Sequence, residues 1–210
     1  MKLAVVAANG RAGRLIVEEA VDRGLDVTAI ARNDENTTSA EKYLKKDLMS
    51  LTKNDLKEFD IVIDAFGAWE NDKLALHSTT LKHLCDILSK SKIRLIVVGG
   101  AGSLYTSKDH IEQIFETKNF PNMYKPVATA MKKALDELRQ RNDVQWTYIS
   151  PALDFQPEGV RTGEYLLAGE ELKFNNAKES IISYADYAIA TIDEATKGNH
   201  IQKRISVLKK

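Results

Sequence analysis

Residues 3–16 read LAVVAANGRAGRLI, an apolar run that leads through a short glycine-containing loop into a helix-like pattern. Every residue from Leu3 to Ala8 is apolar, as expected for a strand that a parallel sheet buries on both faces. Apolar residues then recur at helical spacing between Ala12 and Arg23, and Gly24 is a natural helix end. Strand, glycine loop and helix in this order predict the first unit of an α/β fold.

The same alternation of short apolar runs and longer amphipathic segments continues along the chain. Further strands are predicted at 26–31, 61–66, 94–98, 146–149 and 201–208, and further helices at 74–90, 124–141 and 182–197. The segment 33–57 is predicted to be largely irregular, with a short strand or turn near Asp47. This order predicts a doubly wound parallel sheet, that is, a three-layer α/β/α Rossmann fold.

Length and composition suit one domain. The 210 residues are 43% apolar and contain no low-complexity tract, so we expect a single Rossmann-type domain over 1–210. A glycine-containing segment with few strand signals, about 152–178, is expected to form a small lobe over the ends of the strands. The helix faces carry no clear apolar surplus, so a monomer and a homodimer both remain open.

Charge and cysteine content indicate the compartment and exclude some partners. Thirty basic and thirty acidic residues cancel, so no overall field favours nucleic acid. No apolar stretch reaches the roughly 18 residues that a membrane span needs. Cys85 is the single cysteine, and it leaves no internal disulfide to form. We therefore expect a cytoplasmic protein that binds neither membranes nor nucleic acid.

The glycine loop predicts phosphate binding. Gly10 lets the backbone approach a pyrophosphate, and Gly13 allows the helix to pack closely on the strand. The helix N-terminus offers free N–H groups and the positive end of a dipole. Arg11 or Arg14 can add a direct charge contact. Ala7 stands where a first glycine is often found, so the motif is partial and depends on its strand–loop–helix setting.

Arg32 bears on the choice of cofactor. It follows the predicted strand 26–31, where an acidic residue would hold the ribose hydroxyls of NAD and an arginine suits the 2′-phosphate of NADP. Asp34 and Glu35 follow closely and are alternative ribose ligands. NADP is therefore the favoured cofactor, with NAD as the alternative. No metal is expected, because His77, His83 and Cys85 lack the spacing of a metal site.

Four stretches together resemble the atypical short-chain dehydrogenase/reductase family, in its NmrA-like branch that includes flavin and biliverdin reductases. They are residues 7–13, VVGGAGSL at 97–104, WTYISPA at 146–152 and ISYADYA at 182–188. Their order and spacing cover nearly the whole chain. The resemblance implies NAD(P)H binding along the strand ends.

The resemblance also implies a role for individual residues of this chain. The family's pyrophosphate contacts correspond to Asn9, Gly10, Arg11, Ala12 and Gly13, and its adenosine phosphate contact corresponds to Arg32. Its adenine contacts correspond to Asp47 and Leu48. The segment beside the ribose corresponds to Ala65, Phe66 and Gly67, and the segment that lines the nicotinamide corresponds to Pro151 and Ala152. Ser103 looks like the polar residue that flavin reductases place beside the nicotinamide, and Tyr124 is a second catalytic candidate.

One family feature is missing. Typical short-chain dehydrogenases use a Tyr-x-x-x-Lys pair for proton transfer, but no lysine stands four residues after any of the seven tyrosines. We therefore expect an NAD(P)H-dependent oxidoreductase that reduces a flavin, a quinone or a similar small acceptor, which needs little acid catalysis. The alternative is a non-catalytic NADP(H)-binding redox sensor of the NmrA-like type.

Overall fold

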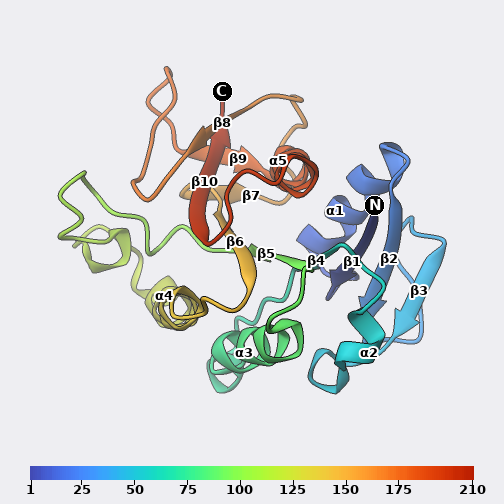
Figure 1. Cartoon of the computed structure of the whole chain (residues 1–210). Helices are drawn as coiled ribbons and strands as arrows, with labels where there is room; N and C mark the ends of the chain where they lie inside the picture. The colour runs from blue at the N-terminus through green and yellow to red at the C-terminus, as the bar shows by residue number, and fades with distance from the viewer.

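The computed structural model describes all residues from 1 to 210 and shows a large central sheet between two layers of helices (Figure 1). Its eight strands follow the order β3-β2-β1-β4-β5-β6-β10-β8. All neighbouring pairs are parallel except β10 and β8, which are antiparallel. The predicted doubly wound α/β/α fold is thus confirmed, with one antiparallel strand added at its edge.

The elements have the following bounds. The strands of the main sheet are β1 (Lys2–Val6), β2 (Asp26–Ala31), β3 (Lys42–Lys45), β4 (Ile61–Asp64), β5 (Arg94–Val98), β6 (Gln145–Ser150), β8 (Tyr165–Ala168) and β10 (Lys203–Lys209); β7 (Asp154–Gln156) and β9 (Ile181–Ser183) form a separate pair; the helices are α1 (Arg11–Asp22), α2 (Lys53–Leu56), α3 (Leu76–Leu88), α4 (Lys125–Arg139) and α5 (Tyr184–Lys197).

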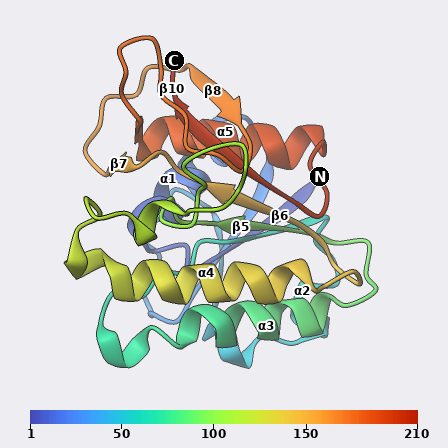
Figure 2. The ribbon, with the colours of Figure 1, turned by 90° about the vertical axis from the view of Figure 1, so that its left-hand side faces the viewer.

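Two apolar clusters bury the two faces of the sheet. One lies under α1 and α5 and includes Ile16 and Ile63, and the other lies under α3 and α4 and includes Leu84 and Leu95. Figure 2 shows α3 and α4 side by side on one face, with α5 on the opposite face. Burial on both faces explains why the strand sequences are apolar at nearly every position.

The expected boundaries differ from the observed ones at two places that matter for the site. The strand predicted to end at residue 66 ends at Asp64, whose carboxylate accepts a hydrogen bond from the Phe66 N–H at 3.0 Å and turns the chain. The helix predicted from residue 182 begins only at Tyr184. Ser183 caps it by accepting from the Asp186 N–H, and the two isoleucines before the cap form β9 instead.

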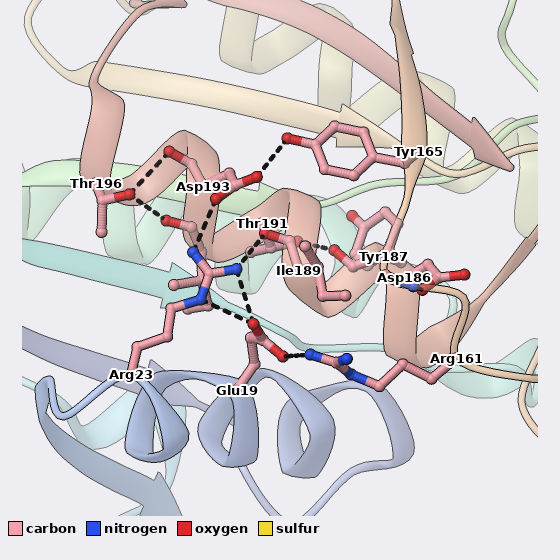
Figure 3. Close-up of polar contacts among 12 residues, drawn as sticks. Glu19, Arg23, Arg161, Tyr165, Asp186, Tyr187, Ile189, Thr191, Asp193 and Thr196 are labelled. Atoms are coloured by element: carbon pink, nitrogen blue, oxygen red, sulfur yellow. Dashed lines mark hydrogen bonds and ion pairs between the residues drawn. The ribbon is translucent and has the colours of Figure 1, made fainter. Parts of the chain in front are cut away.

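The segment 152–178 contains more strand than its sequence indicates, because β7 pairs with β9 and β8 joins the main sheet. Figure 3 shows how the part around Arg161 and Tyr165 is attached to α1 and α5. Arg161 donates to Glu19 of α1 at 2.8 Å, and the Tyr165 hydroxyl donates to Asp193 of α5 at 2.7 Å. Arg23 joins the two helices by pairing with both of these carboxylates.

Candidate functional site

The loop between β1 and α1 is shaped to receive a phosphate group. The Gly10 N–H donates to the Ala7 carbonyl at 3.0 Å, so the chain turns tightly before the helix begins. A Cβ atom on Gly13 would lie 2.7 Å from the Ala7 oxygen and 2.8 Å from the Ala8 oxygen, so only glycine fits there. No side chain caps α1, and its first turn holds no acidic residue. The positive end of the helix dipole is therefore free for an anion, and a pyrophosphate fits this loop.

Ala7 has a left-handed backbone conformation, with φ of +57°. A glycine adopts this conformation without steric penalty, whereas alanine does so at some cost. The residue that makes the sequence motif partial therefore still takes up a glycine-like conformation, and the loop keeps its shape.

Asn9 and the loop after β2 hold each other in place. The Asn9 amide donates to the Glu35 carbonyl at 2.7 Å, and its oxygen accepts from the Thr37 N–H at 3.2 Å. The Asp34 carboxylate pairs with Lys45. Arg32, at the end of β2, is exposed and forms no ion pair. The Arg32 guanidinium is thus free for a ligand. Of the two acidic residues considered for ribose binding, Asp34 pairs with Lys45 and Glu35 lies beside Asn9.

A cavity of about 460 Å³ adjoins this loop. Arg11 and Arg14 line it from α1, and Tyr184 lines it from the start of α5. The remaining lining residues are Leu15, Glu18, Thr37, Thr38, Ser39, Pro157 and Glu158. The cavity therefore lies between the basic side chains at the start of α1 and the segment 152–178.

The predicted adenine contacts take two different positions. The Asp47 carboxylate caps a short 3-10 helix by accepting from the Met49 N–H at 2.9 Å, and Asp47 is exposed. Leu48 is buried in the apolar cluster under α3 and α4. The structure therefore leaves Asp47 accessible at the edge of the site and uses Leu48 for packing.

The loop after β4, which contains Ala65, Phe66 and Gly67, is held from two sides. The Asp64 carboxylate binds the Phe66 N–H, and the imidazole of the buried His77 on α3 hydrogen-bonds with the backbone of Ala68, 3.0 Å from its oxygen. Burial lowers the pKa of His77 and so favours its neutral ring. A Cβ atom at Gly67 would meet nothing within 4 Å, so this loop borders open space.

Two buried tyrosines brace the ends of β5 and β6. The Tyr148 hydroxyl accepts from the Gly100 N–H at 3.2 Å, and its ring lies against Gly99, where a Cβ atom would collide with it. The Tyr187 hydroxyl donates to the Ile149 carbonyl at 2.7 Å from the opposite face of the sheet. Pro151 and Ala152 follow directly and are buried. The segment predicted to line the nicotinamide is therefore buried directly after a strand that hydrogen bonds hold in place.

No hydrogen bond joins the two catalytic candidates. Ser103 is buried, and both its hydroxyl and its carbonyl oxygen accept from Nη1 of Arg204, at 3.0 and 2.9 Å. Tyr124 is 45% exposed and directly precedes α4. Arg204, on β10, has no sequence signal that links it to residue 103, because 101 residues separate the two and only the fold makes them neighbours.

Exposed apolar side chains border the same edge of the sheet. Trp69 follows β4, Leu153 follows β6, and Tyr124 stands at the start of α4. In a parallel sheet with crossover helices, these three positions all lie at the carboxyl ends of the strands. The three side chains leave apolar surface exposed at this edge of the sheet.

Comparisons with known proteins show which family the chain belongs to. Residues 7–195 match the model of a family described as NAD(P)H-binding. The chain is 52% identical to SP1627 of Streptococcus pneumoniae TIGR4, a "putative NADH-flavin reductase", with a TM-score of 0.98 and full coverage of both chains. It is 40% identical to the uncharacterized protein YwnB of Bacillus subtilis (strain 168), over 99% of this chain and 98% of that protein. The anaerobilin reductase ChuY of Escherichia coli O157:H7 shares the fold at 15% identity, with a TM-score of 0.76 over 100% of this chain and 97% of ChuY.

None of the helices combines the length and the apolar character needed to cross a bilayer. The matched segment begins in the glycine loop and ends in α5, so it contains the loops that follow β1, β4, β5 and β6. The chain belongs to the NAD(P)H-binding family.

Proposed function

We propose that this protein is an NAD(P)H-dependent reductase that passes a hydride to a flavin, a quinone or a similar flat acceptor. The observation that carries the proposal is the phosphate loop, with a position that only glycine can fill and a helix N-terminus without a carboxylate. When bound, the nicotinamide supplies the hydride, and the acceptor takes its proton from solvent.

The residues of the chain then act mainly by positioning. The loop after β1 holds the pyrophosphate, and the tyrosine-braced ends of β5 and β6 hold the nicotinamide against the acceptor ring. The Ser103 hydroxyl is already bonded to Arg204, and Ala128 stands four residues after Tyr124. Because neither residue has a partner that would make it a proton donor, we expect substrates that take up hydride without acid catalysis. The name of SP1627 supports a flavin among them.

The test is NADPH and NADH oxidation by the purified protein with FMN, FAD, riboflavin and quinones. We expect acceptor-dependent turnover above the protein-free rate. Replacement Trp69→Ala is expected to raise KM for the acceptor several-fold, because it removes apolar contact area at the rim. Ile201→Ala, which removes a partly exposed apolar side chain just before β10, is the matched control and is expected to leave KM unchanged. Micromolar cofactor binding without turnover on any acceptor would overturn the reductase proposal and support the redox sensor.

Arg32 is proposed to select NADP over NAD, since its exposed guanidinium has no carboxylate partner. Arg32→Glu is expected to weaken NADPH binding at least tenfold and NADH binding much less, because only NADPH carries the 2′-phosphate. Dissociation constants from fluorescence titration measure the difference. Lys57→Glu makes the same charge change at an exposed site beyond α2. Equal losses for both cofactors would contradict a contact with the 2′-phosphate.

A further inference from the structure

Asp64 is a buried carboxylate without a positive partner. It is the last residue of β4, is 4% exposed, and lies in register with Val6 of β1 and Val97 of β5. Its single hydrogen bond comes from the Phe66 N–H. No lysine, arginine or histidine forms an ion pair with it. Burial of an unpaired carboxylate is unfavourable, so its retention calls for a physical reason.

The position of Asp64 in the sheet suggests that reason. The chain leaves β1 toward β2 and β3 on one side and leaves β4 toward β5 and β6 on the other. In open α/β sheets, ligands bind at such a switch point, outside the carboxyl ends of the strands. Asp64 ends the strand that flanks this crevice. It lies between the phosphate loop after β1 and the glycines after β5.

The titratable groups around Asp64 offer it no ion-pair partner. Burial raises the pKa of the Cys85 thiol on α3 and that of the Tyr148 phenol on β6 to about 12. Burial also lowers the pKa of His77, which is on α3 beside Phe66. The residues in register on β1 and β5 are valines. Arg204, beyond Tyr148 in the same row, already binds Ser103 and Glu170.

We propose that Asp64 discriminates between the two redox forms of the bound nicotinamide cofactor and favours the oxidised form. This inference rests on the proposed function. The oxidised ring carries a positive charge and the reduced ring does not, while the rest of the cofactor is the same in both. At a separation on the order of 10 Å and an effective dielectric constant of about 20, a unit negative charge would change the ratio of the two affinities on the order of tenfold.

The effect depends on pH with a defined sign. Burial raises the pKa of the Asp64 carboxyl to about 6, although the Phe66 N–H bond partly offsets it. Below this value the group is neutral and cannot distinguish the two forms. Above it the carboxylate is charged, so the preference for the oxidised cofactor grows as the pH rises through 6. Near and below pH 6, where part of the Asp64 population is protonated, binding of the oxidised form is therefore expected to release protons.

The experiment measures dissociation constants of NADP⁺ and NADPH by calorimetry and fluorescence between pH 5.5 and 8, and those of NAD⁺ and NADH in parallel. Titration of the 2′-phosphate cancels in the ratio of the two forms. For the unaltered protein we expect Kd(NADPH)/Kd(NADP⁺) to increase several-fold over this range. Asp64→Asn keeps an acceptor for the Phe66 N–H but carries no charge. It is expected to weaken NADP⁺ binding about tenfold at pH 7.5, to leave NADPH binding unchanged and to abolish the pH dependence.

Asp60→Asn, which removes an exposed carboxylate just before β4, is the matched control and is expected to change neither constant. Equal weakening of both forms by Asp64→Asn would show that Asp64 only supports the loop, and would overturn the proposal. A ratio that stays constant with pH in the unaltered protein would overturn it without any variant. Failure of all four cofactors to bind would instead contradict the proposed function.

Discussion

At residue 7 the backbone has φ of +57°, a conformation that costs an alanine about 1 kcal/mol relative to glycine. We expect Ala7→Gly to raise the free energy of unfolding by up to about 1 kcal/mol, because the steric gain exceeds the entropy that a glycine adds to the unfolded chain. Urea denaturation measures the change. Ala12→Gly, in the first turn of α1, is the matched control and is expected to lower stability by about 0.5–1 kcal/mol. A loss of stability in both variants would show that residue 7 is not strained.

Among the elements, β5, α5 and the connection to β10 meet at one buried ion pair. Arg94 pairs with Glu194 and donates to its carbonyl and to the Thr147 hydroxyl, both at 2.7 Å. Glu194 also accepts from the His200 N–H at 3.0 Å. Burial opposes ionisation of Glu194, but the bonds from His200 and Arg94 outweigh it, so the pKa of the Glu194 carboxyl is lowered. The charged Glu194 carboxylate therefore stabilises the folded state above pH 4.5, and this contribution to the free energy of unfolding is lost as the pH falls.

We expect Glu194→Gln to lower the free energy of unfolding by about 3 kcal/mol at pH 7, because it leaves the Arg94 charge buried and unpaired. The deficit relative to the unaltered protein is expected to shrink as the pH falls below 4.5, because the unfolded chain then takes up a proton at this carboxyl and the advantage of the lowered pKa is lost. Denaturation curves at several pH values measure it. Lys82→Gln removes one partner of an exposed helical pair with Asp86 and is expected to change stability by less than about 0.5 kcal/mol. Equal effects at pH 7 and pH 3 would contradict the ionic role of Glu194.

At the scale of the whole molecule, the order of strands determines where chemistry can occur. Helices cover both faces of the sheet, so the ends of the strands are where backbone groups and loops remain accessible (Figures 1 and 2). The phosphate loop, the loop after β4 and the braced ends of β5 and β6 all lie at this edge. The contacts of Arg161 and Tyr165 hold the segment after β7 against α1 and α5 (Figure 3).

The sequence by itself determined the layered fold and most element positions. The strands predicted at 26–31 and 94–98 have the observed bounds. This succeeds because a strand buried on both faces must be apolar throughout, and an amphipathic helix must repeat its apolar residues every three to four positions. The glycine loop could also be predicted from the sequence, since the residues that shape it lie next to one another in a single turn.

Only the tertiary structure decided what surrounds the site residues. The sequence did not predict that the Asp64 carboxylate lacks an ion-pair partner, because that depends on which residues of β1 and β5 stand in register with it. The bond between Ser103 and Arg204 joins residues 101 positions apart. Periodicity records which face a residue occupies but not which strand is its neighbour. Register and crossover order are properties of the assembled sheet, and they determine which charges remain unpaired at the ends of the strands.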